Sequence, residues 1–249
     1  MSELKISLIM PAKNEEKFIG QAIDAIIKAD YENWELIVID DHSTDRTFDI
    51  VSGYAEDEPR IKVYKNEGNG KIVGLNYGFR LSKGEFIKCI DADDILDNLF
   101  FVHLKNGIDG EVMYHDSYIT RSNLSIIGTS KINSNYLKLD FSYCLQNLKS
   151  LPRWAWSFNR DIGNKIFPMP EAIPFEDVWF SLIIRKYANI IKYIPEQLYY
   201  YRQNENQTYG GILNFSPGIV VFRAIRVLKL IHVLETDKTN QLTYDIDTK

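Results

Sequence analysis

Cysteine is scarce in this sequence, whose 249 residues include only two, Cys89 and Cys144. Two isolated cysteines provide neither a disulfide framework nor the paired spacing of a zinc site. We therefore expect both thiols to be small core side chains in a protein of a reducing compartment.

Long apolar runs are also absent. No segment provides the roughly 18 to 20 consecutive apolar residues of a membrane-spanning helix. The start, MSELKISLIMPAKNEE, lacks the basic stretch and long apolar core of a signal peptide. The sequence thus indicates a cytoplasmic protein that is soluble or peripherally attached to a surface.

Positive charge is in deficit, since 29 lysines and arginines face 34 acids and give a net charge of −5. A general nucleic-acid binder needs a broad positive surface, so we expect no nucleic-acid partner. A ligand that carries only two phosphates is still compatible with this charge. Hydrophobic residues make up 45% of the chain, enough for one sizeable core.

Strand-like and helix-like segments alternate through the first hundred residues. Strands are predicted at 5–10, 34–40, 60–65 and 85–91, and helices at 14–29, 43–55 and 70–82. Pro11 should end the first strand, Asn14 should cap the first helix, and Ser43 or Thr44 should cap the second. Short connections between alternating elements predict an α/β fold with a doubly wound, mostly parallel sheet.

The pattern changes near residue 110. A small additional antiparallel strand pair is predicted at 111–120 and 125–132, helices at 135–148 and 175–188, and aromatic strand-like segments at 190–202. We expect a single domain over 1–212, with halves at 1–105 and 106–212. Residues 213–249 should form an amphipathic helix followed by a polar tail.

Two groups of carboxylates follow predicted strands. Asp40 and Asp41 end the run WELIVID, and Asp91, Asp93 and Asp94 follow EFIKCI. Ligands of open α/β sheets bind beyond the carboxyl ends of the strands, and a divalent cation makes gathered acids tolerable. Oxygen ligands favour Mn²⁺ or Mg²⁺, with a diphosphate completing the shell. The alternative is a solvated turn in which Asp94 caps the next helix.

Four segments follow one another in an order typical of one family: ISLIMPAKNEEKFI, LIVIDDHSTDRT, KGEFIKCIDADDIL and PFEDVWFSLII. In these segments the chain resembles the family 2 glycosyltransferases, inverting enzymes of the GT-A fold that use nucleotide-diphosphate sugars. The resemblance is specific over residues 6–96 and weakens over 97–170. It implies metal-dependent transfer of one hexosyl or N-acetylhexosaminyl unit, from a UDP-sugar, in bacterial surface polysaccharide synthesis.

The first two segments would bind the donor nucleotide. Asp41 would accept a hydrogen bond from N3–H of uracil, a donor that cytosine lacks, and Asp40 would orient the loop. The alternative for Asp41 is a helix cap. The resemblance places Pro11, Ala12 and Glu15 against base and ribose, and the alternative for Glu15 is a first-turn acid that favours the helix dipole.

The D-x-D triplet and the glycine turn before it would hold the diphosphate. Lys71 follows Gly70 at a predicted helix start, where N–H groups and a lysine suit a phosphate; a simple glycine turn is the alternative. In the family, the last Asp of the triplet binds the metal, which is Asp93 here. Asp91 would contact ribose or metal-bound water, so we assign it to both donor and metal binding.

The ED pair would act on the acceptor. The resemblance makes Asp177 the general base, which an inverting displacement needs because the attacking hydroxyl loses its proton as it bonds. Glu176 is assigned to acceptor binding. The family often carries a histidine just after LYYYR, where this chain has Gln203 and Asn204, so a histidine metal ligand is in doubt.

Two further features suggest acceptor contacts. Trp154 and Trp156 in LPRWAWSF would stack on sugar rings, and the alternative is that they belong to the core. Residues 217–234 place basic side chains at steps of three beside a broad apolar face. This pattern favours peripheral contact with an anionic membrane and hence a saccharide or lipid-linked saccharide acceptor. The alternatives are packing on the body or a homodimer.

Two other functions are compatible with metal-binding carboxylates. A sugar-nucleotide nucleotidyltransferase would normally open with a glycine-rich basic loop, and MPAKNEEKF has no glycine. A non-catalytic nucleotide-sugar binder would not need both Asp93 and Asp177. Sugar transfer is therefore the function that the sequence favours.

Overall fold

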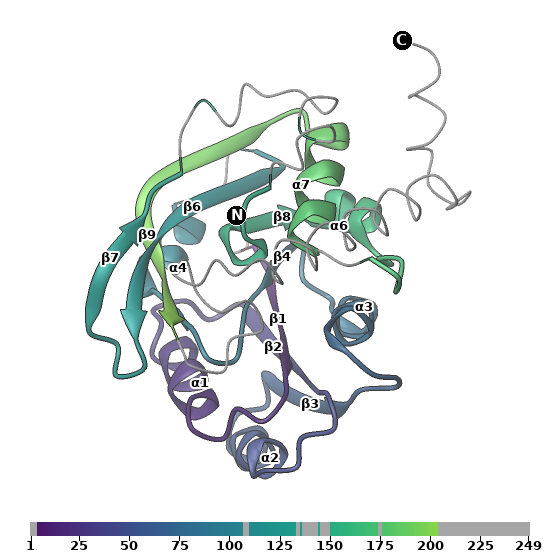
Figure 1. The fold of residues 1–249 in the computed structure, drawn as a ribbon, viewed down its shortest axis with the longest axis vertical. Coiled ribbons are helices and arrows are strands. Elements are labelled where there is room, and N and C mark those ends of the chain that lie inside the picture. Colours follow the sequence, from purple (N-terminus) through teal and green to yellow (C-terminus); the bar gives the residue numbers. More distant parts are fainter. Residues whose placement is uncertain are drawn as a thin grey trace, which may run out of the picture.

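A mixed β-sheet runs through the described part of the chain (Figure 1). The structure, a computed structural model, describes residues 4–203 apart from 107–109, 133–134, 136–143, 145–149 and 174–175. Within these residues the sheet has nine strands in the order β3-β2-β1-β4-β8-β6-β9-β5, and β7 pairs with β6. The predicted helix at 135–148 and the segment 213–249 lie outside the described part.

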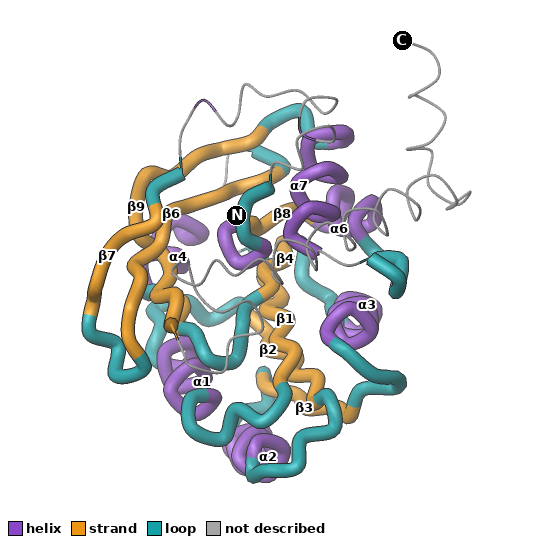
Figure 2. Tube along the Cα trace, viewed as in Figure 1, coloured by secondary structure: helices purple, strands orange, loops and turns teal. Residues whose placement is uncertain are grey.

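The first half of the sheet is parallel. It comprises β1 (Ile6–Ala12), β2 (Trp34–Asp40), β3 (Ile61–Lys65) and β4 (Phe86–Cys89), which alternate with α1 (Ile19–Ile27), α2 (Thr47–Asp57) and α3 (Lys71–Leu81). Figure 2 shows α1 and α2 on one side of these strands and α3 on the other. The predicted doubly wound arrangement is thus confirmed for this half.

The strands β1 and β2 are buried along their whole length, as their continuous apolar runs predict. The prediction that Pro11 ends the first strand is wrong, because pairing with β2 continues to Ala12 opposite Asp40. On its other side β1 pairs with β4 only as far as Ile9. A proline has no N–H to donate, so it is tolerated where a strand pairs with a neighbouring strand on one side only.

Both predicted helix caps are also wrong. Helix α1 begins at Ile19, five residues after Asn14, and α2 begins at Thr47, whose N–H donates to Asp45 Oδ1 at 2.9 Å. Instead, the N–H of Asn14 donates to Ser43 Oγ at 2.9 Å, and the N–H of Thr44 donates to Asn14 Oδ1 at 2.8 Å. These polar residues therefore link the loops after β1 and β2 to each other.

The second half of the sheet contains more antiparallel structure than the predicted strand pair. Its elements are β5 (Ile95–Leu96), α4 (Asn98–Lys105), β6 (Val112–Arg121), β7 (Ile126–Ser130), the 3₁₀ turn η2 (Arg153–Ala155), β8 (Trp156–Asn159), α6 (Arg160–Ile166), α7 (Glu176–Tyr187) and β9 (Ile191–Gln203). The pair β6–β7 is confirmed as antiparallel, but β8 also runs antiparallel between β4 and β6. The two halves are consequently one continuous sheet.

The short α4 has a cap that the sequence analysis misplaced. Asp97 Oδ1 accepts a hydrogen bond from the N–H of Leu99 at 2.8 Å, so Asp97 and not Asp94 is the N-cap. Asp94 is buried and bonds elsewhere.

The register of the parallel strands positions the site. Ala12, Asp40 and Lys65 lie side by side at the ends of β1, β2 and β3, and β4 ends opposite Ile9. The acidic loops that follow these strands therefore share one edge of the sheet. Both cysteines are buried, as predicted, and neither belongs to a disulfide. None of the described helices is long and apolar enough to cross a membrane.

Helix α3 packs so closely on β1 that one of its glycines has no room for a side chain. A Cβ on Gly78 would lie 2.5 Å from Ile9 Cγ2, whereas a Cβ on Gly53 of α2 would meet nothing within 4 Å. We expect Gly78→Ala to lower the free energy of unfolding by about 1–3 kcal/mol through overpacking. The matched Gly53→Ala should raise it by about 0.5–1 kcal/mol through helix propensity. Urea denaturation measures both changes, and stabilisation by both variants would contradict this account of the packing.

Candidate active site

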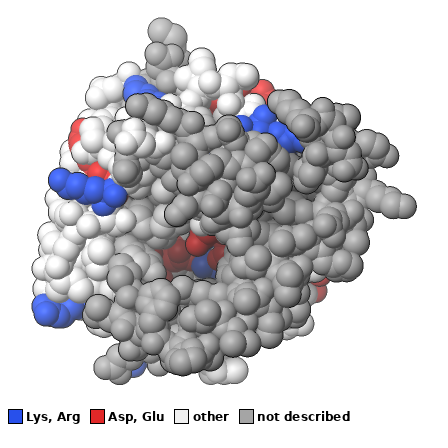
Figure 3. Space-filling view, turned by 45° about the horizontal axis from the view of Figure 1, so that its top comes forward, with Lys and Arg blue, Asp and Glu red and all other residues white. Residues whose placement is uncertain are grey.

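Acidic and basic side chains lie together at the bottom of a hollow in one face of the molecule (Figure 3). The described residues that converge beyond the strand ends come from the loops after β1, β2 and β4, the start of α3, the turn η2 and the start of α7. Most of the predicted site residues belong to these segments. The charged side chains among them differ strongly in burial and in the ion pairs that they form.

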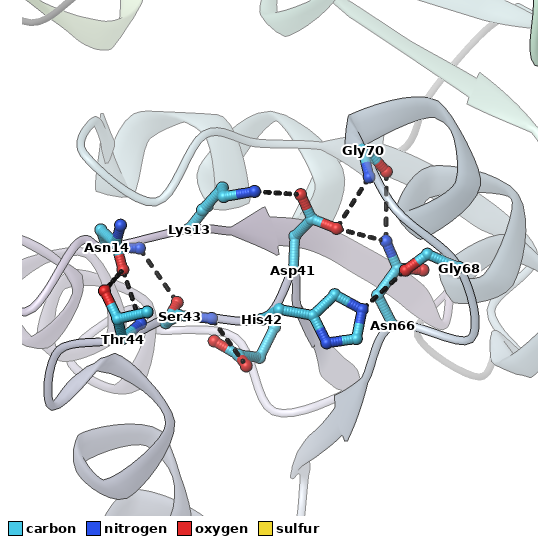
Figure 4. A network of polar contacts seen from close by, with 10 residues as sticks. Lys13, Asn14, Asp41, His42, Ser43, Thr44, Asn66, Gly68 and Gly70 are labelled. Atoms are coloured by element: carbon cyan, nitrogen blue, oxygen red, sulfur yellow. Dashed lines mark hydrogen bonds and ion pairs between the residues drawn. The ribbon is translucent and has the colours of Figure 1, made fainter.

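Asp41 occupies a cradle at the end of β2 (Figure 4). Its Oδ1 accepts hydrogen bonds from Asn66 Nδ2 and from the N–H of Gly70, both at 2.8 Å, and Lys13 Nζ lies 3.3 Å from Oδ2. Burial alone would raise the pKa of Asp41, but these donors outweigh it and lower the pKa below its ordinary value. Asp41 is thus an ionised acceptor, and because α2 begins at Thr47 the helix-cap alternative is wrong.

Two neighbouring predictions can also be compared with the structure. Asp40 Oδ2 accepts a hydrogen bond from the N–H of Ser43 at 3.3 Å, so its predicted role in orienting the loop is confirmed. Pro11 and Ala12 are buried in the last two positions of β1. They stand directly beside β2, with Ala12 accepting a hydrogen bond from the N–H of Asp41 at 2.8 Å.

Glu15 belongs to the acidic cluster and is not a helix acid, because α1 begins four residues later. Burial, together with the nearby carboxylates of Asp93, Asp91 and Asp45, raises its pKa to about 7 against the lowering effect of Lys71. Its N–H donates to Thr47 Oγ1 at 2.7 Å, which fixes the loop after β1 on the start of α2. Glu15 therefore shares its electrostatic surroundings with the D-x-D triplet.

Asp91 is the most strongly paired acid of the cluster. Its Oδ1 contacts both Lys71 Nζ, at 2.7 Å, and Arg153 Nη2, and its N–H donates to the hydroxyl of Tyr199 at 2.9 Å. Burial would raise its pKa, but Arg153 and Lys71 outweigh burial and lower the pKa to about 2. Lys71 Nζ also lies 3.6 Å from Glu176 Oε1, so one lysine bridges the triplet and the ED pair.

The other two acids of the DADD segment have the opposite environment. Burial raises the pKa of both Asp93 and Asp94, and repulsion from Asp91 adds to it. Asp94 Oδ1 accepts a hydrogen bond from the N–H of Arg202 at 2.7 Å, which ties the segment to the end of β9. Asp93 is half-buried.

These acids form no ready-made metal cage, since no three acidic, histidine or cysteine side chains among the described residues are arranged as a ligand set. They nevertheless fit a hard divalent cation, which takes one or two protein carboxylates and completes its shell with substrate phosphates. Burial and the acidic neighbour Asp91 raise the pKa of Asp93. A bound divalent cation would offset the repulsion between these negative charges. Because Asp91 Oδ1 already holds two cations, Asp93 is the better ligand of the two.

Asp177 lies at the start of α7, close to the same cluster. Its Oδ1 accepts a hydrogen bond from the main-chain N–H of Arg153 at 2.7 Å. Burial raises its pKa to about 6 and the Glu176 carboxylate acts in the same direction, against the lowering effects of Arg153 and Lys71. A carboxylate with such a pKa is ionised at neutral pH and still basic enough to take a proton.

The two predicted sugar platforms differ in burial. Trp156 is fully buried and its ring lies 5.3 Å from that of Tyr114, which places it in the core, the alternative named above. Trp154 is 5% exposed and stacks on Tyr199 at 5.2 Å between ring centroids. Of the two, only Trp154 adjoins the cluster through its neighbour in sequence, Arg153.

Two site-forming residues had no predicted role. Arg153 directly precedes the two tryptophans, and a lone arginine in the apolar stretch LPRWAW is a signal for a buried ion pair. Lys88 lies fully buried in β4, where its Nζ donates to Trp154 O and is 2.6 Å from His115 Nε2. A lysine within the strand run EFIKCI was the corresponding signal.

Comparisons with known proteins agree with this geometry. Residues 7–110 match the family described as glycosyl transferase family 2. The chain is 36% identical over 134 residues to UDP-Glc:alpha-D-GlcNAc-diphosphoundecaprenol beta-1,3-glucosyltransferase WfgD of Escherichia coli, a match that covers 51% of each protein. It spans 52% to 62% of the length of the first curated relatives that it matches.

Solved structures show the same fold. S. aureus TarS 1-349, in complex with UDP-GlcNAc, superposes with a TM-score of 0.67 at 21% identity, covering 99% of this chain and 76% of that one. The mannosyltransferase PcManGT from Pyrobaculum calidifontis, in complex with GDP-Man and Mn²⁺, gives 0.61 at 16% identity, covering 100% and 80%.

The D-x-D triplet, the cradled Asp41 and the ED helix lie together on a sheet of this topology, and the family match covers the residues that carry the first two. Residues 7–110 of the chain match the family 2 glycosyltransferases, and the chain has the GT-A fold.

Proposed function

We propose that this chain is the catalytic domain of an inverting, metal-dependent glycosyltransferase. It moves one sugar, a hexosyl or N-acetylhexosaminyl unit, from a UDP-sugar to a saccharide or lipid-linked saccharide acceptor in bacterial surface polysaccharide synthesis. The names of the relatives support this setting, since WfgD is named for a UDP-Glc donor and a diphosphoundecaprenol-linked acceptor.

One observation carries the proposal. Asp91 and Asp177 lie 86 positions apart in the sequence but belong to one cluster, where one carboxyl group has a lowered pKa and the other has a raised pKa. Asp91 has a pKa of about 2 and Asp177 has a pKa of about 6. Environments that separate the pKa values of neighbouring carboxyl groups are typical of sites that use one as a permanent charge and the other as a base. A solvated acidic turn would not produce this difference.

The donor side is built from the first half of the chain. Asp41 would accept the N3–H of uracil, Pro11, Ala12 and Glu15 would lie against base and ribose, and Lys71 would move its charge toward the diphosphate. The exposed fraction of the Lys71 side chain, 42%, makes this cation accessible from solvent. PcManGT, which has the same fold, was solved with GDP-Man, so the fold alone does not set the base, and Asp41 and its surroundings would select it here.

Asp93, with Asp91 beside it, would hold Mn²⁺ or Mg²⁺. When bound, the ion would offset the negative charge that develops on the departing diphosphate. PcManGT was solved with Mn²⁺, which supports a divalent cation. Lys71 adds positive charge at the same place from the start of α3, where main-chain N–H groups also favour anions.

Asp177 would act on the acceptor. In a single displacement the acceptor oxygen forms a bond to the anomeric carbon while the bond from that carbon to the diphosphate oxygen breaks. Asp177 takes the proton of the acceptor hydroxyl, so the diphosphate leaves with the electron pair. Glu176, and Trp154 where its ring is exposed, would orient the acceptor sugar.

The finer predictions about partners remain proposals. Residues 217–234, which would contact an anionic membrane or a second copy of the chain, lie outside the described residues. A lipid-linked acceptor would bring the enzyme to the inner face of the cell membrane. Gln203, at the end of β9, stands where the family often has a histidine, so metal binding would rest on Asp93 and the substrate phosphates.

The donor assignment predicts a base preference. UDP should bind about 10- to 100-fold more tightly than CDP, because cytosine offers no N3–H to the charged Asp41. Asp41→Ala should abolish this preference, and Asp93→Ala should abolish the gain in UDP affinity that Mn²⁺ produces. Calorimetric titration of UDP, GDP, CDP and dTDP with and without Mn²⁺ measures both effects. Asp49→Ala, which removes an exposed acid from the first turn of α2, is the control. If no nucleoside diphosphate binds under any condition, the transferase proposal is wrong.

The base assignment predicts a pH profile. Asp177 must be ionised to take a proton, so kcat/KM should fall below an apparent pKa of about 6 and level off above it. Asp177→Asn retains an oxygen for the N–H of Arg153 but cannot accept the proton, so kcat should drop by about 10²- to 10⁴-fold. UDP release from UDP-glucose and UDP-N-acetylglucosamine, in the presence of a lipid-diphosphate-linked saccharide, measures the rate. Wild-type activity in Asp177→Asn, at unchanged UDP affinity, would reject this residue as the base.

A further inference from the structure

Arg153 touches both carboxylates that define the site, through different parts of the residue. Its side chain contacts Asp91 Oδ1 through Nη2, and its main-chain N–H donates to Asp177 Oδ1 at 2.7 Å. The Arg153 side chain is 2% exposed, so both contacts are shielded from water. A single residue therefore joins the donor side of the cluster to the base.

The turn that carries Arg153 is held on both sides. The N–H of Leu151, two residues earlier, donates to Ser181 Oγ on α7 at 3.0 Å. Lys88 Nζ, from β4, donates to the carbonyl oxygens of Trp154 and Trp156. The segment thus forms a strap between α7, which carries Asp177, and β4, which leads into Asp91.

The guanidinium of Arg153 is not fully satisfied by the described protein. Its Nε and Nη1 are buried and have no hydrogen-bond partner. Buried charged groups with unpaired N–H donors cost stability, and an apolar side chain would fill the same space without that cost. A role in packing alone does not explain an arginine here, whereas a need for its charge does.

We propose that Arg153 is a positioning residue that couples donor binding to the base, with its guanidinium anchored on Asp91 and its main-chain N–H fixing Asp177. The inference rests on the proposed function, since it assigns Asp91 to the donor side and Asp177 to proton transfer. It adds a residue outside the D-x-D and ED segments to the machinery of the reaction.

The electrostatics around Asp177 support this coupling. The charged groups that face its carboxylate are Glu176 on the same helix, Arg153 on η2 and Lys71 on α3. Glu176 raises the pKa of Asp177, and Arg153 and Lys71 lower it. Without Arg153, a half-buried carboxylate beside another acid would hold its proton to higher pH and would lose its use as a base near neutrality.

The test is the pH profile of kcat/KM for Arg153→Met, which removes the charge and leaves the main-chain N–H in place. We expect the acidic limb to move up by about one pH unit, because an opposite charge beside a carboxylate lowers its pKa by about 1 to 3 units. At high pH, kcat should remain reduced by about 10- to 100-fold because the base is less well placed. Arg153→Lys, which restores a charge, should return the limb toward its wild-type position.

Arg160→Met is the matched control. Arg160 follows the other end of β8, beside the start of β4, and its guanidinium donates to Gly84 O and Ser82 Oγ away from the cluster. This variant should leave the acidic limb unchanged. An unmoved limb in folded Arg153→Met would overturn the inference. If Arg153→Met does not fold, Arg153→Lys decides. Wild-type kcat in Arg153→Lys would show that a single ammonium charge is enough and that the planar guanidinium is not needed.

A second readout is independent of turnover. The carboxyl ¹³C resonance of Asp177, identified by its absence in Asp177→Asn, should titrate at higher pH in Arg153→Met than in the wild-type protein. If wild-type protein transfers no sugar but this shift occurs, the proposed function fails and only the electrostatic effect of Arg153 on Asp177 stands. If transfer occurs and the resonance titrates at the same pH in both proteins, the coupling fails and the function stands.

Discussion

The pairing of Asp91 with two cations is the interaction on which the site depends. Acids from three strand ends converge at one edge of the sheet, and without compensation their mutual repulsion would oppose folding. Lys71 and Arg153 both contact one oxygen of Asp91. This contact binds the start of α3, the end of β4 and the turn η2 to one another. It also keeps Asp91 ionised, so the cluster retains a fixed negative charge.

The same pairing gives the remaining acids different environments. Burial and the carboxylate of Asp91 raise the pKa of Asp93, and Lys71 and Arg202 lower it. In the proposed function, Asp93 lies on the side of the cluster where a divalent cation and a diphosphate would enter. Asp177 accepts a hydrogen bond from the main-chain N–H of Arg153, and burial raises its pKa to about 6 although this hydrogen bond lowers it. In the proposed function, Arg153 would thus lie between the donor side of the cluster and the base.

The mixed sheet makes this arrangement possible. If the sheet consisted only of the parallel strands of the first half, it would end at β4. Its edge would then carry only the residues that are proposed to bind the nucleotide. The antiparallel strand β8 continues the sheet past β4 and delivers η2 directly beside Asp91. Strand β9 then returns alongside β6 and brings Tyr199 and Arg202 to the N–H of Asp91 and the carboxylate of Asp94. The catalytic edge is thus built from segments that are distant in sequence.

Much of the first half was determined by the sequence itself. The apolar runs WELIVID and EFIKCI, and the helical spacing between them, led to the correct strands and to the shared edge at Asp41 and Asp91, because strand period and burial are local properties. Helix starts at Asn14 and Ser43 were misjudged, since Ser43 Oγ accepts from the N–H of Asn14, and Asn14 Oδ1 accepts from the N–H of Thr44, across two loops. The positions of Arg153 and Lys88 and the different pKa values of Asp91 and Asp177 were decided only by tertiary structure. Arg153 and Lys88 contact partners 62 and 66 positions away, and no local pattern of residues records which partner a charge will meet.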